Sequence, residues 1–313
     1  MRIIFLGSSE FALPSLKALI DGDYDVSLVV TQPDRNKGRG LALQATAVKK
    51  CAQECGLKLY QPPKINSPEA VKFLKGFDAD LFIVISYGQI LSKEVLSIPK
   101  VFAINAHASW LPKYRGAAPV NWAIIKGEAT TGVSIMKVDE KMDTGPVLLQ
   151  KESAILPDEN AIELEDRLAV TASELLISSL KSIGNNNFVL KAQDDSLASL
   201  APKLKKENGI IDWGRSANDI HNLIRGCRDW PGAFSCFKGK LLKILKANVI
   251  PLSGIKPRPG EILNVSTEGI TVAAGENGIM IKELQIEGRR KMSVKEFISG
   301  HRISVGEMLE NKK

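Results

Sequence analysis

The chain has 313 residues and a formal net charge of +7, with 44% hydrophobic and 25% charged residues, a composition typical of a globular protein with room for two domains. No apolar run approaches the roughly 20 residues that a membrane-spanning helix needs, and the apolar start at 1–7 is too short for a secretion signal. These features argue against a membrane-spanning protein, and we expect a cytoplasmic one with no membrane partner.

The first part of the chain alternates short apolar runs with amphipathic stretches. We predict helices at 9–20, 46–54 and 67–74, and strands at 2–6, 25–31, 57–60, 81–85 and 101–106. This alternation predicts a Rossmann-like, doubly wound α/β fold with a mostly parallel sheet. The turn after the first strand lacks the Gly-x-Gly-x-x-Gly pattern, so we expect no dinucleotide site.

A charged segment follows the second predicted strand. Residues 31–41 combine charged side chains with two glycines at the edge of the sheet where open α/β folds bind ligands. By composition alone, the segment is either a solvated connection or a flexible loop within reach of a ligand.

Polar side chains stand at the end of the strand predicted at 101–106. Asn105 and His107 are two residues apart there, so they project to the same side. Asp143 supplies a carboxylate from a polar turn before Gly145. An amide, an imidazole and a carboxylate are therefore available for one ligand-binding edge. His107 is the candidate base, since it is the only histidine before residue 200.

The other histidines and the cysteines carry no such pattern. We expect His221 and His301 to be packed or solvated side chains. Cys51 and Cys55 lie four apart and could suggest a metal pair, yet no further ligand with zinc-type spacing accompanies them. We therefore expect core or half-buried thiols, and no metal.

The remaining elements predict a second domain. A helix at 119–125, strands at 132–138 and 146–155, and a helix at 161–183 complete a first domain over 1–183, and the polar stretch 184–207 is a predicted linker. Beyond residue 208 we predict one helix and several short strands separated by glycine turns, at 216–225, 233–237, 241–250, 260–265, 270–274 and 279–284. Such a pattern is typical of a small β-barrel.

The positive charge is confined to the carboxyl-terminal third. Residues 1–202 carry 22 Lys and Arg against 23 Asp and Glu, a net charge of −1, whereas residues 203–313 carry 20 against 12, a net charge of +8. Such an excess favours a polyanionic partner for the domain at 208–313, with a solubilising surface as the alternative.

Several motifs together resemble one family. They are Asn-x-His at 105–107, Ser-Trp-Leu-Pro at 109–112, Asp-Thr-Gly at 143–145, Thr-Gln-Pro-Asp-Arg at 31–35, Gly-Arg-Gly at 38–40, Arg-Gly-Ala-Ala-Pro at 115–119 and Arg-Gly-Cys-Arg-Asp-Trp-Pro-Gly-Ala-Phe at 225–234. This order is similar to that of the formyltetrahydrofolate-dependent formyltransferases, most closely the branch that formylates methionyl-tRNA. One departure is Trp110, where the family usually has leucine.

The resemblance implies a reaction in translation initiation. The formyl group of 10-formyltetrahydrofolate, a co-substrate, would pass to the α-amine of initiator methionyl-tRNA. Asn105 would donate a hydrogen bond to the oxygen of the tetrahedral intermediate, and His107 would help to remove the amine proton. Asp143 would orient the imidazole and select its tautomer.

The resemblance also implies binding residues. One side of the folate pocket would come from Ile85, Tyr87, Gly88 and Gln89, and the other from Ser109, Trp110, Leu111 and Pro112. The tRNA acceptor arm would meet Arg35, Lys37 and Arg39 in the loop at 31–41. The basic domain at 208–313 would be an OB-like barrel that binds tRNA.

Two other functions stay open from the sequence. One is formylfolate-dependent transfer to a small amine, on a sugar nucleotide or glycinamide ribonucleotide. The other is a non-enzymatic RNA- or folate-binding protein. The basic carboxyl-terminal domain and the loop at 31–41 favour tRNA over a small amine, and the presence of Asn105, His107 and Asp143 favours an enzyme. We expect a monomer.

Overall fold

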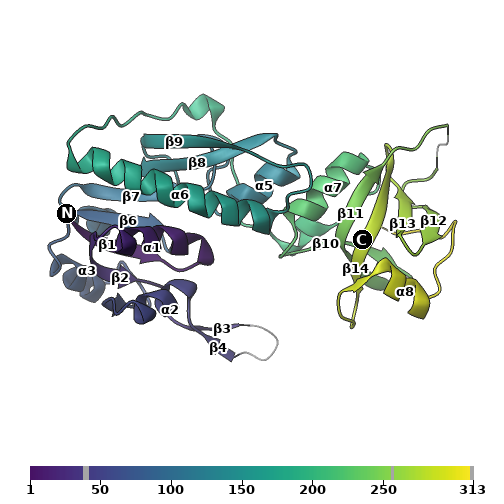
Figure 1. Ribbon diagram of the computed structural model, residues 1–313, viewed down its shortest axis with the longest axis horizontal. Helices are drawn as coiled ribbons and strands as arrows, with labels where there is room; N and C mark the ends of the chain where they lie inside the picture. Colours follow the sequence, from purple (N-terminus) through teal and green to yellow (C-terminus); the bar gives the residue numbers. More distant parts are fainter. Residues whose placement is uncertain (38–41, 255–256, 311–313) are drawn as a thin grey trace. The chain divides into compact units, whose positions relative to one another are not determined.

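The computed structural model describes residues 1–37, 42–254 and 257–310. The chain divides into two compact units (Figure 1). Unit 1 comprises Met1–Pro119, Thr130–Ala154 and Glu165–Ala201. Unit 2 comprises Val120–Ala129, Ile155–Leu164 and the chain from Pro202 onward.

Unit 1 is built on a seven-stranded sheet with the strand order β5-β2-β1-β6-β7-β8-β9. The five strands from β5 to β7 are parallel, and β8 and β9 are added antiparallel. Their bounds are β1 Arg2–Gly7, β2 Asp25–Val30, β5 Leu59–Tyr60, β6 Leu81–Ile85, β7 Phe102–His107, β8 Thr130–Lys137 and β9 Val147–Ala154. The predicted Rossmann-like, mostly parallel sheet is confirmed.

Helices cover this sheet because its strands are apolar on both faces. β1 and β6 are buried along almost their whole length, as expected for central parallel strands. On one face Leu6, Val30 and Phe82 pack against Leu74 and Val95. The helices in this part of the chain are α1 Leu13–Asp21, α2 Ala47–Glu54, α3 Pro68–Lys75, α4 Lys93–Leu96 and α6 Ala161–Gly184, and the short 3-10 helix η1 is Glu10–Ala12.

Side-chain caps fix where several helices begin. The hydroxyl oxygens of Thr46, Ser67 and Ser92 accept hydrogen bonds from backbone N–H groups in the first turns of α2, α3 and α4. Each cap pairs an N–H group that the helix itself leaves without a partner. The predicted helices at 46–54 and 67–74 therefore begin at their capping residues, while the one-turn helix α4 was not predicted.

Part of the charged segment at 31–41 forms a strand. β3 (Arg35–Lys37) pairs antiparallel with β4 (Ala42–Gln44) in a small sheet of its own. Residues 38–41 lie outside the described residues. The side chains described here, those of Arg35, Leu43 and Gln44, are exposed. The sequence of this segment does not show the apolar and polar alternation of a half-buried strand, so it was predicted as a loop.

Unit 2 contains an antiparallel sheet with the order β10-β11-β14-β13-β12, and β15 also pairs with β14. The bounds are β10 Ala233–Phe237, β11 Lys240–Ile250, β12 Ile262–Ser266, β13 Gly269–Ala273, β14 Gly278–Ile286 and β15 Met292–Ser293. Bridges from Met308 to Glu261 and from Glu310 to Cys236 connect the two ends of this sheet. The predicted series of short strands is confirmed, and closure as an OB-like barrel stays a prediction.

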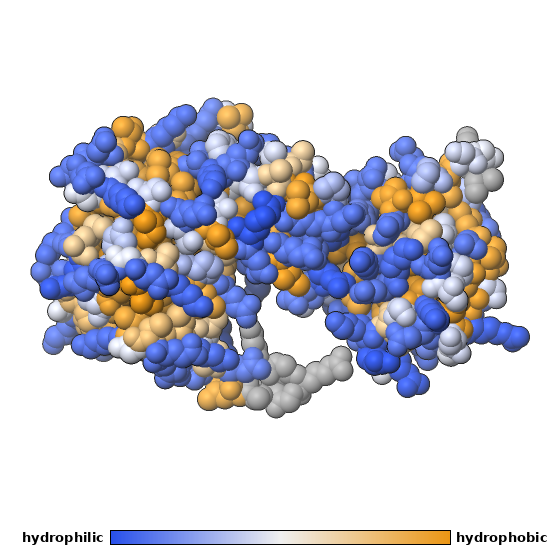
Figure 2. Space-filling model, in the orientation of Figure 1, coloured by the Kyte–Doolittle hydropathy of each residue, from blue (hydrophilic) through white to orange (hydrophobic). Residues whose placement is uncertain are grey.

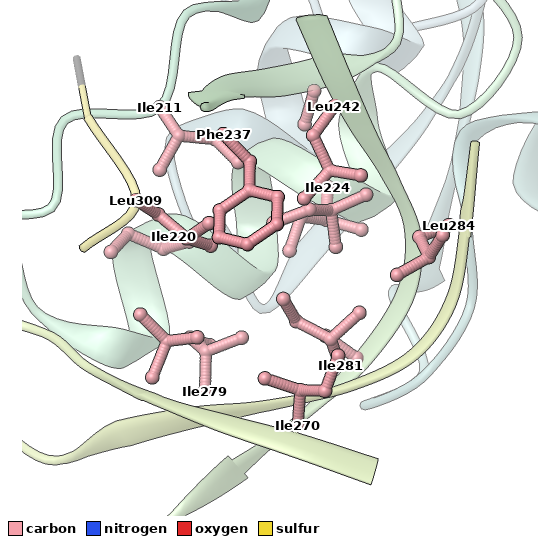
Figure 3. Packing of buried hydrophobic residues seen from close by; sticks show 14 of the residues in the cluster. Ile211, Ile220, Ile224, Phe237, Leu242, Ile270, Ile279, Ile281, Leu284 and Leu309 are labelled. Atoms are coloured by element: carbon pink, nitrogen blue, oxygen red, sulfur yellow. The ribbon is translucent and has the colours of Figure 1, made fainter. Parts of the chain in front are cut away.

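One helix contributes side chains to the core of unit 2. α7 (Ala217–Gly226) directs Ile220 and Ile224 toward Phe237, Leu242 and Ile281 (Figure 3). Two further helices are α5 Pro119–Ile125, most of which lies in unit 2, and α8 Val294–Gly300. The surface face drawn in Figure 2 is mainly hydrophilic over both units, with scattered apolar areas. Among the described residues, no helix is long and apolar enough to cross a membrane.

Candidate active site

Asn105 and His107 stand at the carboxyl end of β7. The register pairs Asn105 with Val84 of the parallel strand β6, and His107 with Ser134 of the antiparallel strand β8. This is the edge at which open α/β sheets bind ligands. His107 is 6% exposed and Asn105 is half-buried, so both side chains are largely covered by protein at this edge.

Asp143 meets both side chains. Its Oδ1 accepts a hydrogen bond from Asn105 Nδ2 at 3.4 Å, and its Oδ2 lies 3.6 Å from His107 Nδ1. The backbone N–H of Gly116 donates to the same Oδ2 at 2.9 Å. The structure therefore brings the three predicted residues together. The contacts to Asn105 and His107 are long for hydrogen bonds.

The other nitrogen of His107 has a backbone partner. His107 Nε2 lies 2.9 Å from the carbonyl oxygen of Tyr114. A carbonyl oxygen only accepts, so Nε2 is the donor and carries a proton in this contact. The tautomer, which we expected Asp143 to select, is set here by Tyr114. No motif indicated this contact, because it uses a backbone atom.

Two glycines shape the backbone around the carboxylate. A Cβ atom on Gly145 would lie 1.9 Å from the oxygen of Lys137, so only glycine fits beside β8. A Cβ on Gly116 would lie 2.6 Å from the oxygen of Ala201, and its φ is +127°. Asp143 itself has a φ of +54°, which aspartate tolerates better than most residues. Steric crowding thus explains why the Asp-Thr-Gly and Arg-Gly motifs have glycine at 145 and 116.

The residues predicted for one folate wall have structural roles. Ile85 and Tyr87 are buried, and burial raises the pKa of the Tyr87 phenol far above its usual value. Gln89 Oε1 accepts from Ile65 N–H, and its Nε2 donates to the oxygen of Pro63. Gly88 has a φ of +90°, which suits glycine in a turn. The side chains of Ile85 and Gln89 are therefore used within the protein, whereas the buried Tyr87 hydroxyl has no hydrogen-bond partner among the described residues. The turn follows the carboxyl end of β6.

The segment 109–112 is fixed to β8 and β9. Ser134 Oγ donates to the oxygen of Ser109, and Leu111 N–H donates to Ser134 Oγ. The oxygen of Leu111, which precedes Pro112, accepts from Gln150 Nε2. Trp110 is 40% exposed, in contrast to its buried neighbours, and it therefore offers an aromatic face to solvent or a ligand.

Two of the three residues predicted to meet tRNA, Arg35 and Lys37, lie on strand β3. Arg35 is exposed and donates from Nη2 to Gln32 Oε1 at 3.0 Å. Lys37 pairs with Ala42 through the backbone of β3 and β4. Arg39 lies outside the described residues.

The remaining histidines are packed side chains, as predicted. His221 lies 3.9 Å from Asp158, and burial lowers its pKa. His301 stacks on Phe297, with ring centroids 4.5 Å apart. In the described part of the chain, no group of three or more His, Cys, Asp or Glu could hold a metal ion.

The cysteines are free thiols. Cys51 and Cys227 are buried, Cys236 is half-buried and Cys55 is exposed. Burial raises the pKa of the Cys227 thiol to about 12, which opposes formation of a nucleophilic thiolate.

Comparison with known proteins identifies the family. The family model described as "Formyl transferase" matches residues 1–180, and the model for the formyl transferase carboxyl-terminal domain matches residues 203–302. The chain belongs to the formyl transferase family. The family expected from the motifs is therefore confirmed.

Similar relatives match along their whole length. The methionyl-tRNA formyltransferase of Geotalea uraniireducens (strain Rf4) is 44% identical over 312 residues, which cover 100% of this chain and 99% of the relative. The methionyl-tRNA formyltransferase of Caldanaerobacter subterraneus subsp. tengcongensis is 45% identical over 311 residues, covering 99% of this chain and 100% of the relative.

Solved structures share the fold at lower identity. HypX from Aquifex aeolicus in complex with tetrahydrofolic acid is 19% identical with a TM-score of 0.66, covering 98% of this chain and 50% of that chain. The sugar 3N-formyl transferase WlaRD is 17% identical with a TM-score of 0.67, covering 93% and 99%. At these identities the likeness supports the fold alone.

Proposed function

We propose that this chain transfers the formyl group of 10-formyltetrahydrofolate to the α-amine of initiator methionyl-tRNA. The observation that carries the proposal is the meeting of Asn105, His107 and Asp143 at one sheet edge. The acceptor is supported by relatives of full length named methionyl-tRNA formyltransferase, at 43–45% identity. The product would be the formylated aminoacyl-tRNA used in translation initiation.

The reaction requires one bond to form and one to break. The amine nitrogen attacks the formyl carbon, and a tetrahedral intermediate with a negative oxygen results. Asn105 Nδ2, whose present bond to Asp143 is long, turns to donate to that oxygen. Losing one such donor typically lowers the rate by about 10²–10³. The bond from the formyl carbon to N10 of the folate then breaks.

His107 transfers the proton, and Asp143 stabilises the positive charge that His107 then carries. The amine loses one proton during the transfer and the departing N10 gains one, so the proton count balances. Nδ1 of His107 takes the proton, because Nε2 is already protonated against Tyr114. Asp143 Oδ2, 3.6 Å away, stabilises the imidazolium that forms. The same nitrogen then returns the proton to N10.

The folate and the tRNA would use different surfaces. The turn at Ile85–Gln89 and the segment Ser109–Pro112 flank the site as the two folate walls. The positive charge of residues 203–313 suits the phosphate backbone of tRNA, with the β3–β4 hairpin placing the acceptor end. We accordingly propose a catalytic region over 1–183, a connection over 184–207, and a tRNA-binding region over 208–313.

A comparison of acceptors tests the proposal. The purified chain is incubated with 10-formyltetrahydrofolate and, in separate reactions, charged initiator tRNA, methioninamide, an amino sugar nucleotide or glycinamide ribonucleotide. We expect formylation of the methionyl-tRNA with a kcat/KM at least about 10³ times that for any small amine. Equal or better use of a small amine would favour the alternative, since sugar formyltransferases share this fold. No transfer to any acceptor would favour a binding protein.

A further inference from the structure

The turn that carries Asp143 is held by a residue far away in the sequence. We propose that Gln193, fixed in orientation by Arg115, is a positioning residue for the Asp143 carboxylate. The inference rests on the proposed function and deepens it. It also gives part of the polar stretch 184–207 a role in the site, although that stretch shows no periodic pattern.

Gln193 binds the backbone of the turn at two points. Its Nε2 donates to the carbonyl oxygen of Asp143 at 2.9 Å and to that of Gly145 at 2.7 Å. One amide group therefore bridges the residues on both sides of Thr144. These bonds hold the peptide that carries the carboxylate, in a turn where Asp143 adopts a positive φ of 54°. A turn of this kind persists where its surroundings fix it.

Arg115 determines which way the amide points. Its Nε and Nη2 donate to Gln193 Oε1 at 3.0 and 2.8 Å. A guanidinium only donates and the two turn carbonyls only accept, so the opposite amide orientation would pair donor with donor and acceptor with acceptor. All hydrogen-bonding positions of the Gln193 amide are used in the present orientation. The amide is thus a rigid link between Arg115 and the turn.

Arg115 is itself held firmly. Its side chain is 8% exposed and pairs with Asp195 at 2.7 Å, while the carboxylate is 82% exposed. Its backbone N–H donates to the oxygen of Ser199, and its oxygen accepts from Ala201 N–H. The segment 193–201 is therefore bound to residue 115 by side chain and backbone together.

Three consecutive residues connect the pair Arg115 and Gln193, which together clamp the turn, to the catalytic groups. Tyr114 offers its carbonyl to His107, Arg115 holds Gln193, and Gly116 N–H donates to the Asp143 carboxylate. A shift of the turn would thus change the distance between carboxylate and imidazole. Gln193 contacts the backbone of Asp143 and acts through it, so it is a positioning residue.

A kinetic cycle tests this role. Gln193→Glu keeps an oxygen for Arg115 but removes both donors to the turn, and Gln193→Met removes donors and acceptor at similar size. We expect each to lower kcat about 10–100-fold, with KM for formylfolate and for methionyl-tRNA changed less than about threefold. The matched control Gln53→Glu, the same chemical change at an exposed position on α2, should retain the parent kcat.

The cycle also includes Asp143→Asn. If Gln193 acts through Asp143, adding Gln193→Met to Asp143→Asn should lower kcat by less than about threefold more, because the effects do not add within one coupled unit. Multiplying effects would overturn the proposal, and so would parent-like turnover of Gln193→Glu.

Amide hydrogen exchange provides a readout that does not depend on activity. The Gly116 N–H bonds the Asp143 carboxylate, so its exchange should speed up at least about tenfold in Gln193→Met as the turn loosens. The bonds between Val147 and Lys191 serve as internal controls and should stay protected. An unchanged exchange rate of the Gly116 N–H in Gln193→Met would overturn the positioning role of Gln193, even if the variant is active. Absence of formyl transfer by the parent chain would instead contradict the proposed function and leave this readout decisive for the clamp.

Discussion

The Nε2 atom of His107 lies 2.9 Å from the carbonyl oxygen of Tyr114, while Nδ1 faces the Asp143 carboxylate at 3.6 Å. The imidazole thus lies between a backbone carbonyl and the Asp143 carboxyl group. Because the carbonyl requires a proton on Nε2, the mechanism that we propose assigns the transferred proton to Nδ1. This differs from a triad in which the carboxylate holds an Nδ1 proton.

The contact predicts the tautomer of the neutral imidazole. In protein labelled with ¹⁵N at histidine, the His107 ring at high pH should show the shifts of a protonated Nε2 and an unprotonated Nδ1. The His107→Ala variant assigns the signal among the three histidines. The reverse pattern, with the proton on Nδ1, would contradict the role given to Tyr114.

Removal of the polar groups should affect turnover more than binding. We expect Asn105→Ala and His107→Ala each to lower kcat by at least about 10², because both act mainly on the transition state. Folate affinity, measured by calorimetry, should change little. Near-parental turnover in either variant would remove that residue from the mechanism.

Trp110 should report folate binding. Its ring is 40% exposed on the segment that we propose as a folate wall, so an unreactive formylfolate analogue should change the tryptophan fluorescence. Trp110→Leu should abolish most of that change. The chain has four tryptophans, which makes Trp230→Phe, a substitution in unit 2 at a residue 51% exposed, a suitable control. An unaltered signal in Trp110→Leu would place its side chain away from the ligand.

The affinity for tRNA should fall steeply with salt. Each phosphate contact releases counterions, and losing one should reduce the slope of log affinity against log salt by roughly 0.7–0.9. Arg39→Ala should lower turnover more than affinity, because we expect the loop at 31–41 to place the methionyl amine. Filter-binding titrations and initial rates measure the two effects. Salt-independent binding would favour the alternative, in which the positive charge serves only to solubilise the surface.

The sequence predicted most of the helices and strands, and it indicated the polar residues that meet at the sheet edge, for separable reasons. Strands such as β6 are continuous apolar runs, and Asn105 and His107 end one of them, so position alone indicated the ligand edge. Gln193 and the Tyr114 carbonyl were missed. Gln193 lies 50 residues from Asp143 in a stretch without periodicity, and backbone carbonyls carry no sequence signature.

The sequence also did not predict which distant segments pack together. The helix at 119–125 was predicted with its observed bounds, yet no sequence pattern indicated that Asn121 Nδ2 donates to the oxygen of Gly226. Hydrophobic periodicity shows that a helix has a face to bury, and it does not show which segment covers that face.

The most direct test is a single-turnover reaction with limiting 10-formyltetrahydrofolate and excess charged initiator tRNA. The account predicts one formylmethionyl-tRNA and one tetrahydrofolate for each formylfolate consumed. It also predicts a rate at least about 10² lower for Asp143→Asn, whose amide keeps the shape but loses the charge that supports His107. Release of tetrahydrofolate without formylated tRNA, or full activity of Asp143→Asn, would contradict it.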